Sequence, residues 1–326
     1  MEIGGYIEFE KYSGKMLHGD GILLNCGRNA LAYLIEANHI TDILMPKFMC
    51  DSCDGVLEKY GVRVRRYSID EAFMPVDLAP RDGEWVYAVN FYGQLSDAYL
   101  KTLKKKHGRL IVDNAQAYFR EPVEGIDTLY TCRKFFGVPD GAVLYSDKRL
   151  DLPLERDISY DRTEYLLGRF EKSASEFYGG YVENNRRFAG EKIKRMSKLT
   201  ENLLRGIDYD AVKEKRTENF LYLHERLKTL NGLPVKPAAG AFMYPLYIEN
   251  GAFLRKRLQE QKIYIPTLWP AVFGRCSEDE KEYRMARDIL PLPVDQRYGK
   301  KEMDIIIGTL QTEMKNLRGI SSLNTM

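Results

Sequence analysis

The chain has 326 residues, enough for two domains with a sizeable core, and 44% of them are hydrophobic. This composition excludes an intrinsically disordered chain. There are 49 lysines and arginines against 47 aspartates and glutamates, a formal net charge of +2. That balance gives no reason to expect nucleic acid or an anionic membrane as a partner.

Targeting and anchoring segments are not evident in the sequence. No run approaches the roughly 20 apolar residues that a membrane-spanning helix needs. The first ten residues lack the basic start and the apolar centre of a secretory signal. Five cysteines, an odd number scattered along the chain, favour a reduced cytoplasmic protein over a disulfide framework.

Helical and strand-like segments alternate through the first half of the chain. Apolar residues have helical spacing after Gly27, a short helix is expected over 56–60 with Asp51 or Ser52 as its cap, and residues 96–107 form an amphipathic helix closed by Gly108. The expected strands are 42–46, 63–69, 85–90, 110–113, the segment before Lys134, and 141–145. This alternation predicts an α/β fold with a mostly parallel sheet covered by helices on both faces.

The second half of the chain changes character. Residues 162–230 are charged, helical in period and nearly free of strand signal. Mixed structure returns afterwards, with strands expected over 243–248 and 262–269, a helix between them, and further α/β structure over 277–289 and 300–314. The pattern predicts a large domain over residues 1–215 and a small C-terminal domain over 216–326.

Asp113 and Lys134 carry the most chemical information in the chain. Asp113 ends the apolar run 110–113, and Lys134 follows 21 positions later, just after the next strand-like segment. Alone, Asp113 suits a loop or a helix cap and Lys134 suits a solvated charge. Together they are what pyridoxal phosphate chemistry needs, because the amine binds the aldehyde and the carboxylate keeps the pyridine nitrogen protonated.

Cys50 and Cys53 form a lone C-x-x-C motif. The remaining cysteines and the four histidines are far apart in sequence and supply no second half of a zinc site. A thioredoxin-like redox motif is expected in a chain of different layout. We therefore interpret the two cysteines as small buried hydrophobes near a loop and expect no metal.

Several short motifs follow one another along the chain. They are Gly27-Arg28-Asn29-Ala30-Leu31, Asn90-Phe91-Tyr92-Gly93-Gln94, Asp113-x-Ala115-Gln116, Lys134-x-x-Gly137-x-x-x-Gly141-Ala142-Val143, Arg195-Met196-Ser197 and the turn-like Leu290-Pro291-Leu292-Pro293. Together and in this order, over about residues 20 to 295, they resemble the motifs of the DegT/DnrJ/EryC/StrS sugar aminotransferases. The resemblance implies a fold type I, pyridoxal phosphate-dependent transferase, with the cofactor bound by the large domain.

The resemblance also implies a role for each matching residue. Lys134 would be the lysine that holds the cofactor and later moves a proton between substrate and cofactor. Asp113 would pair with the pyridinium nitrogen, and Gln116 would lie near the ring oxygen. Thr131 is a further candidate for the cofactor phosphate.

The phosphate itself is expected at a helix that begins at Gly27. Gly27, Arg28 and Asn29 would open that helix, whose free backbone amides suit an anion. The family usually has Gly-Thr where this chain has Gly27-Arg28, so Arg28 either pairs with the phosphate or points outward.

Two further positions depart from the family pattern. The aromatic residue that stacks on the cofactor ring would fall near Cys50, which makes Phe48 a candidate replacement. The asparagine that reaches the neighbouring subunit's cofactor phosphate would fall at Ile193, which makes Asn184 or Asn185 a candidate replacement.

The implied activity is transamination. The resemblance implies that an amino acid donates the amino group to a nucleotide-linked keto-sugar, for surface-polysaccharide or amino-sugar synthesis. The family's dehydratase branch has histidine at the lysine position, so Lys134 favours the aminotransferase branch. The expected assembly is a homodimer with residues 162–187 near its interface. The alternative is a catalytically silent relative that binds a sugar nucleotide or a regulatory partner.

Overall fold

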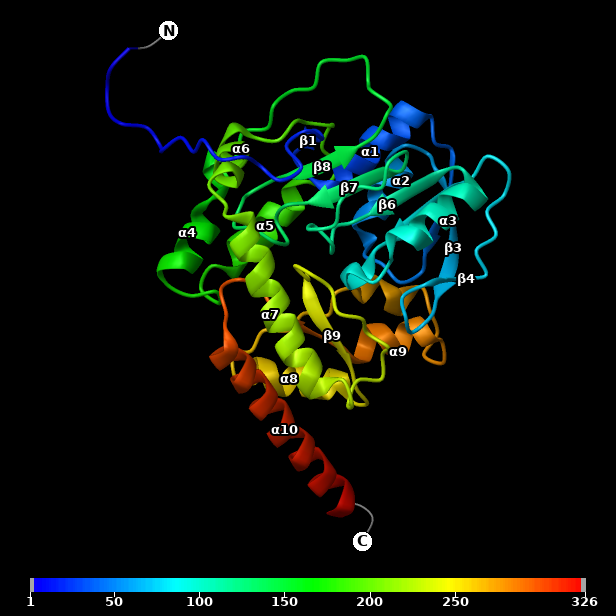
Figure 1. Ribbon diagram of the computed structural model, residues 1–326, viewed down its shortest axis with the longest axis vertical. Coiled ribbons are helices and arrows are strands. Elements are labelled where there is room, and N and C mark those ends of the chain that lie inside the picture. The colour runs from blue at the N-terminus through cyan, green and yellow to red at the C-terminus, as the bar shows by residue number, and fades with distance from the viewer. Residues whose placement is uncertain (1–2, 324–326) are drawn as a thin grey trace.

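An eight-stranded sheet forms the upper half of the molecule in the computed structural model, which describes residues 3–323 (Figure 1). The strand order is β1-β8-β7-β6-β5-β2-β3-β4. Its strands are β1 (Ile22–Leu24), β2 (Asp42–Pro46), β3 (Arg63–Ile69), β4 (Pro75–Val76), β5 (Trp85–Val89), β6 (Leu110–Asp113), β7 (Asp127–Thr131) and β8 (Ala142–Tyr145). Strands β3, β2, β5, β6 and β7 run parallel, whereas β4, β8 and β1 pair antiparallel towards the two edges. The mostly parallel sheet predicted from the sequence is confirmed.

Helices cover both faces of this sheet. Successive side chains of a strand point to opposite faces, so each strand packs against helices on both sides. On β5 and β6, Tyr87 and Ile111 join the buried cluster that contains the residues of α1. Val86 and Leu110 point the other way and join the cluster that contains α3. The helices of the chain are α1 (Gly27–Asn38), α2 (Asp54–Lys59), α3 (Asp97–His107), α4 (Glu164–Glu171), α5 (Tyr178–Arg187), α6 (Lys198–Arg205), α7 (Tyr209–Leu227), α8 (Gly251–Glu260), α9 (Lys281–Asp288) and α10 (Lys300–Leu323), with short 3-10 turns η1 (Asp51–Cys53), η2 (Phe91–Gly93), η3 (Tyr160–Arg162) and η4 (Pro270–Gly274).

Local capping explains where α3 begins and ends. The Ser96 hydroxyl accepts a hydrogen bond from the Tyr99 backbone N–H at 3.2 Å and so satisfies one of the helix's free donors. Gly108 follows the last turn with φ of 71°, a backbone conformation that glycine adopts without a side-chain clash. Both ends lie where the sequence predicted them.

The C-terminal part of the chain contains a two-stranded antiparallel sheet of β9 (Met243–Tyr247) and β10 (Ile289–Pro293). Apolar residues of α7, α8 and α10 pack with this sheet into a separate core. Pro291 lies directly opposite Pro245 in the register, so the two missing N–H groups coincide at one position of the ladder. The turn predicted over residues 290–293 is therefore wrong, because this segment is part of β10.

A second prediction is also wrong in this region. Residues 262–269 form no strand and connect α8 to η4 as irregular chain. Ile265 and Trp269 are buried there, which accounts for the apolar pattern. Pro266 lacks the N–H that a ladder position requires, and the segment has no neighbouring strand to pair with. No helix within residues 3–323 combines the length and the apolar character needed to cross a bilayer.

Helix α7 runs alongside both parts of the molecule (Figure 1). The boundary predicted at residues 215/216 falls inside this helix, so no loop separates the two parts there. Arg216, on α7, is only 2% exposed and donates to the backbone oxygens of Phe135 (3.2 Å) and Ala241 (3.0 Å), and also to the side chain of Gln296 (2.8 Å). One buried guanidinium thus ties together the segment after β7, the start of β9 and the loop after β10.

Replacing Arg216 with methionine tests this connection. The substitution keeps a long side chain but leaves buried carbonyl oxygens without a donor, so the free energy of unfolding should fall by about 3 kcal/mol. Urea denaturation measures the change. The matched control is Lys213→Ala, an exposed residue of the same helix, which should alter stability by less than about 0.5 kcal/mol. An equal effect of both substitutions would contradict the proposed connection.

Candidate active site

The carboxyl ends of β2, β5, β6 and β7 meet at one edge of the sheet, because these strands are parallel neighbours. In open α/β sheets, ligands bind outside this edge. Asp113 is the last residue of β6, and Lys134 follows the end of β7 by three positions. The strand pairing therefore brings to one edge the two residues that the sequence singled out.

Asp113 is held in a defined orientation. One carboxylate oxygen accepts a hydrogen bond from the Tyr87 hydroxyl at 2.9 Å, and the other accepts from the Ala115 backbone N–H at 2.8 Å. Tyr87 is 1% exposed. Its pKa is raised first by this burial and then by the negative charge of Asp113. The tyrosine therefore stays a neutral donor, and the half-buried carboxylate keeps lone pairs for a further partner.

Lys134 combines a fixed backbone with a free side chain. The carbonyl of the next residue, Phe135, accepts hydrogen bonds from Arg216 (3.2 Å) and Gln296 (2.9 Å). The ammonium group of Lys134 is exposed, lies 5.7 Å from the centroid of the Phe242 ring, and has neither an ion pair nor a hydrogen bond to any residue within 3–323. An amine in this position is available for covalent chemistry and for proton transfer.

Cys50 and Cys53 lie in η1, which follows the carboxyl end of β2 and so belongs to the same edge of the sheet. The pKa of Cys50 is lowered first by the neighbouring Cys53 thiol, and the positive charge of Lys134 acts in the same direction. The pKa of Cys53 is raised first by Cys50 and by burial, with a smaller contribution from the negative charge of Asp113. Cys53 is buried, as the sequence predicted, whereas Cys50 is partly exposed.

The N-terminus of α1 borders the same edge. A Cβ atom on Gly27 would lie 2.9 Å from the Thr131 methyl group, so only glycine permits this approach of helix and strand. The N-cap residue Cys26 makes no side-chain capping bond, and the backbone N–H groups of Gly27 and Arg28 have no partner within the described chain. The first turn of α1 therefore has free donors that suit an anion, and the phosphate site expected at this helix stays a prediction.

Two arginines stand beside this helix end and meet at Asn185 of α5. Arg28 donates to the Asn185 backbone oxygen at 3.1 Å, and Arg133 donates to its side-chain oxygen at 2.6 Å. The Nε of Arg133 is buried and has no hydrogen-bond partner in residues 3–323. Arg28 therefore points towards α5 and not into bulk water, and a cavity of about 260 Å³ opens beside it.

Other candidate residues are already engaged in the protein. Asn29 is 3% exposed, and its amide donates to the Asn25 side chain (2.7 Å) and to the Lys192 backbone oxygen (2.8 Å). Gln116 is 4% exposed, and its amide oxygen accepts from the Tyr92 N–H at 2.9 Å. The Thr131 hydroxyl donates to the Ala115 backbone oxygen at 3.4 Å. The Asn29 side chain supports the loop, while the Gln116 amide nitrogen has no partner among the described residues.

Two replacements considered from the sequence do not fit their expected roles. Phe48 is fully buried and packs against Trp269 at a centroid distance of 4.4 Å, so its ring belongs to an aromatic core and is not free to stack on a ligand. Asn184 is 2% exposed and donates to the Pro139 carbonyl (2.8 Å) and the Tyr165 hydroxyl (3.1 Å) of its own chain. It is therefore not positioned to reach a neighbouring subunit. Asn185, the other candidate, binds Arg28 and Arg133 of its own chain.

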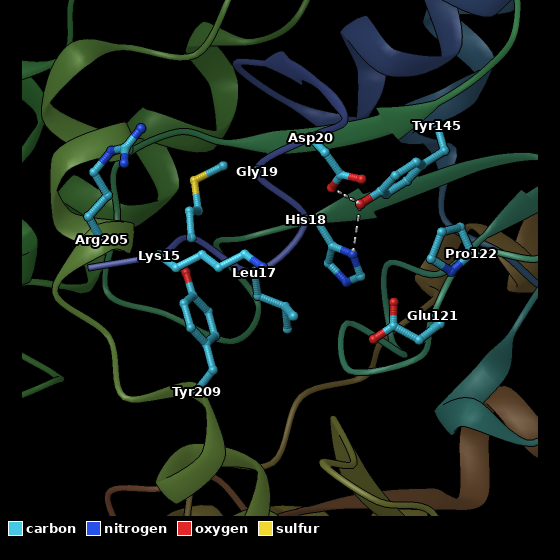
Figure 2. A pocket seen from close by; sticks show the side chains of 11 residues that line it. Lys15, Leu17, His18, Gly19, Asp20, Glu121, Pro122, Tyr145, Arg205 and Tyr209 are labelled. Atoms are coloured by element: carbon cyan, nitrogen blue, oxygen red, sulfur yellow. Dashed lines mark hydrogen bonds between the residues drawn. The ribbon is translucent and has the colours of Figure 1, made fainter. Parts of the chain in front are cut away.

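A cavity of about 670 Å³ lies elsewhere in the molecule. Figure 2 shows that in it His18 is hydrogen-bonded to Tyr145, whose hydroxyl in turn donates to Asp20 at 2.6 Å. Tyr145 pairs with Thr128 near the start of β7, whereas Lys134 follows the end of that strand. Burial lowers the pKa of His18, so its ring is neutral near pH 7. This cavity is therefore separate from the edge that carries Lys134 and Asp113.

Two residues of the site, Tyr87 and Arg133, were missed by sequence reasoning, because they flank the motifs without belonging to them. Arg133 carried a local signal, since it directly precedes the lysine. The contact of Tyr87 with Asp113 depends on how strands are ordered in the sheet.

Substitution at Gly27 tests the close approach of α1 to β7. Gly27→Ala should destabilise the protein by about 2 kcal/mol, because the new methyl group overlaps that of Thr131. In a Thr131→Ser background, which removes that methyl group, the same substitution should cost less, by about 1 kcal/mol. Thermal or urea unfolding of the four proteins completes the cycle. Gly55→Ala, on α2 with open space around it, is the control, and equal costs in both backgrounds would contradict the contact.

Known proteins resemble this chain in their fold. No family model matches the chain, and no curated protein matches it. Solved structures do match over nearly the whole chain. They include a DegT DnrJ EryC1 StrS aminotransferase from Brucella abortus (16% identity, 89% of this chain and 85% of that chain, TM-score 0.59), DesV from S. venezuelae (18%, 93% and 90%, 0.64), and PseC from Helicobacter pylori, an aminotransferase involved in the biosynthesis of pseudoaminic acid (12%, 90% and 86%, 0.60). The structural similarity agrees with the resemblance seen in the sequence motifs, and the chain has the fold of these aminotransferases, fold type I.

Proposed function

We propose that this protein is a pyridoxal phosphate-dependent aminotransferase. The observation that carries the proposal is the free ammonium group of Lys134 beside the oriented carboxylate of Asp113, at the carboxyl edge of a fold type I sheet. Lys134 has no carboxylate partner among the described residues, although Asp113 ends the strand next to β7, so both groups are available to a ligand.

The residues present fit the cofactor. Asp113 can accept a hydrogen bond from a protonated pyridine nitrogen, and the first turn of α1 with Arg28 and Arg133 suits a phosphate. The unpartnered Nε of Arg133 is the strongest sign, because a buried guanidinium nitrogen without an acceptor is costly. When bound, pyridoxal phosphate supplies an electron sink for the carbanion that forms on the amino acid.

Each residue of the site would then have its own role. Lys134 would hold the cofactor through its amine and would carry a proton to and from the reacting carbon of the substrate. Asp113 would stabilise a positive charge on the ring nitrogen, and the Tyr87 hydroxyl donates to its carboxylate and keeps it in place. Gln116 is proposed to face the ring oxygen through its amide nitrogen, since its amide oxygen is bound to Tyr92.

The substrate class follows from the structural neighbours and the motifs. We propose a keto-sugar carried by a nucleotide as the acceptor and an amino acid as the donor, in a reaction sequence that makes amino sugars or surface polysaccharides. DesI, a further structural neighbour, was crystallised in the presence of its TDP-sugar product (16% identity, TM-score 0.62). The proposal for this chain rests on that similarity and not on contacts in its own site.

A symmetric homodimer is the proposed assembly. Large apolar side chains are exposed over residues 158–178, among them Phe170 (90%), Tyr160 (77%) and Ile158 (70%). Exposed apolar groups gathered on neighbouring helices are typical of protein interfaces. Helix α5 also carries Asn185, so a partner bound here would adjoin the phosphate end of the site.

Replacing Lys134 with alanine tests the central assignment. Transamination should fall by several orders of magnitude, because the covalent anchor and the proton carrier are lost together. Borohydride should fix the cofactor to a tryptic peptide containing Lys134 in the parent and to no lysine in Lys134→Ala. Lys105→Ala, an exposed residue of α3, is the control and should behave as the parent. Cofactor fixed covalently to the Lys134→Ala protein would transfer the role to another lysine.

The same preparation separates an enzyme from a catalytically silent relative. The bound cofactor gives a visible absorbance band, and an amino donor such as glutamate should bleach it in the parent. A band that forms and does not respond to any of the common amino acids would support the binding-protein alternative and contradict transamination.

The dimer is tested by light scattering of the protein with its cofactor. The expected mass is twice that of one chain. Phe170→Asp should shift the equilibrium towards monomer, because a charge replaces an exposed apolar side chain in the proposed interface. Ile305→Asp changes an exposed side chain of α10 outside the proposed interface and should leave the mass unchanged. A parent monomer that transaminates would rule out a site shared between subunits.

A further inference from the structure

The Cys50–Cys53 pair has a geometry suited to forming a disulfide. Cys50 is the N-cap of η1, and Cys53 is the last residue of the same turn, so the two side chains project within one helical turn. The Cys50 Sγ lies 2.9 Å from the Ser52 hydroxyl of the same turn. Both cysteines are free, and no group of three or more potential ligands that could hold a metal ion occurs in the part of the chain that the structure describes.

Charges around the pair make the two thiols unequal. The hydrogen bond from Cys53 lowers the pKa of Cys50, with the positive charge of Lys134 acting in the same direction. The pKa of Cys53 is raised, first by donating that hydrogen bond and then by burial. The thiolate is the reactive form of cysteine, so Cys50 is the attacking sulfur and Cys53 the second sulfur.

The other three cysteines provide an internal contrast. Cys26, Cys132 and Cys276 are 6%, 0% and 7% exposed, whereas Cys50 is partly exposed. Burial is the first cause that raises their pKa values to about 11, about 12 and about 11, respectively. A thiol reagent that acts on thiolates should therefore select Cys50.

We propose that Cys50 and Cys53 form a reversible disulfide in the lining of the active site, made by a hydroperoxide and prevented by bound cofactor. The Cys50 sulfur attacks one peroxide oxygen, the O–O bond breaks and hydroxide leaves, which gives a sulfenic acid. The Cys53 sulfur then displaces the sulfenic oxygen, which leaves as water with the Cys53 proton. Two thiols are oxidised, and one hydrogen peroxide is reduced to two waters.

The location of the pair connects its oxidation state to the site. Both cysteines lie in η1, after the carboxyl end of β2 and at the same edge of the sheet as Asp113 and Lys134, so a cofactor held by those two residues would shield the partly exposed Cys50. Oxidation would also remove the negative charge of the Cys50 thiolate, on which the charge of Lys134 acts. The shielding part of the proposal rests on the proposed function, whereas formation of the disulfide rests on the position of both cysteines in one helical turn.

Peptide mapping after peroxide treatment tests both parts. Trypsin releases residues 48–59 as one peptide that contains both cysteines and no other. In cofactor-free protein this peptide should lose two hydrogen atoms before the peptides with Cys26, Cys132 or Cys276 change, and dithiothreitol should restore it. With cofactor at ten times its Kd, the rate should fall about tenfold, because only the unliganded fraction reacts.

Two variants assign the sulfurs. In Cys53→Ser the peptide should gain one oxygen, trapped by a sulfenic acid reagent, and should not lose hydrogen. Cys276→Ser, the control, should oxidise at residues 48–59 like the parent. Oxidation of Cys276 before this peptide, or of Cys53 alone in Cys50→Ser at the parent rate, would overturn the disulfide proposal.

Loss of the cofactor effect is a separate outcome. A cofactor that is fixed to Lys134 by borohydride but leaves the oxidation rate unchanged would overturn the shielding. Absence of any bound cofactor would overturn the proposed function and would leave the disulfide measurement in cofactor-free protein standing as its own test.

Discussion

The position of Lys134 depends on one buried cation, the guanidinium group of Arg216. It has no ion pair within residues 3–323 and binds backbone carbonyls of Phe135, Ala241 and Phe242 together with Gln296. Burial lowers the pKa of Arg216 to about 10, which still leaves the group charged near pH 7. Charge-assisted bonds to three carbonyls are directional, so the segment that carries the lysine is fixed relative to α7 and β9.

This arrangement separates two requirements that a covalent lysine must meet. Its backbone must be rigid so that the amine reaches a defined place, and its side chain must remain free to react. The neighbours of Lys134 meet the first requirement, since Cys132 and Phe135 are buried on either side. The exposed ammonium group meets the second. A salt bridge to Asp113 would have stabilised the pair locally, but it would also have occupied both groups that the proposed cofactor site uses.

Strand-level features could be predicted because they depend on local patterns. The runs 63–69 and 110–113 read as strands from their own residues, and parallel order then placed Asp113 and Lys134 at one edge. The wrong predictions concern features that depend on contacts between distant segments. Phe48 has the expected position in the sequence, but its ring packs in an aromatic core. Residues 262–269 have a strand-like composition but no neighbouring strand with which to pair. The direction of the Arg28 side chain was left open, because it is set by α5, far along the chain.

Positive and negative charges are separated along the edge of the sheet, and their order restricts the kind of ligand that fits there. Arg28, Arg133 and the free end of α1 place positive charge at one end, whereas Asp113 places negative charge at the other, with Lys134 and Cys50 on the lining. A neutral sugar or an amino acid alone does not require such separation. A ligand with a phosphate at one end and a protonated ring nitrogen at the other matches it in both sign and order, since each end would then neutralise a charge that the fold leaves without a strong counter-ion.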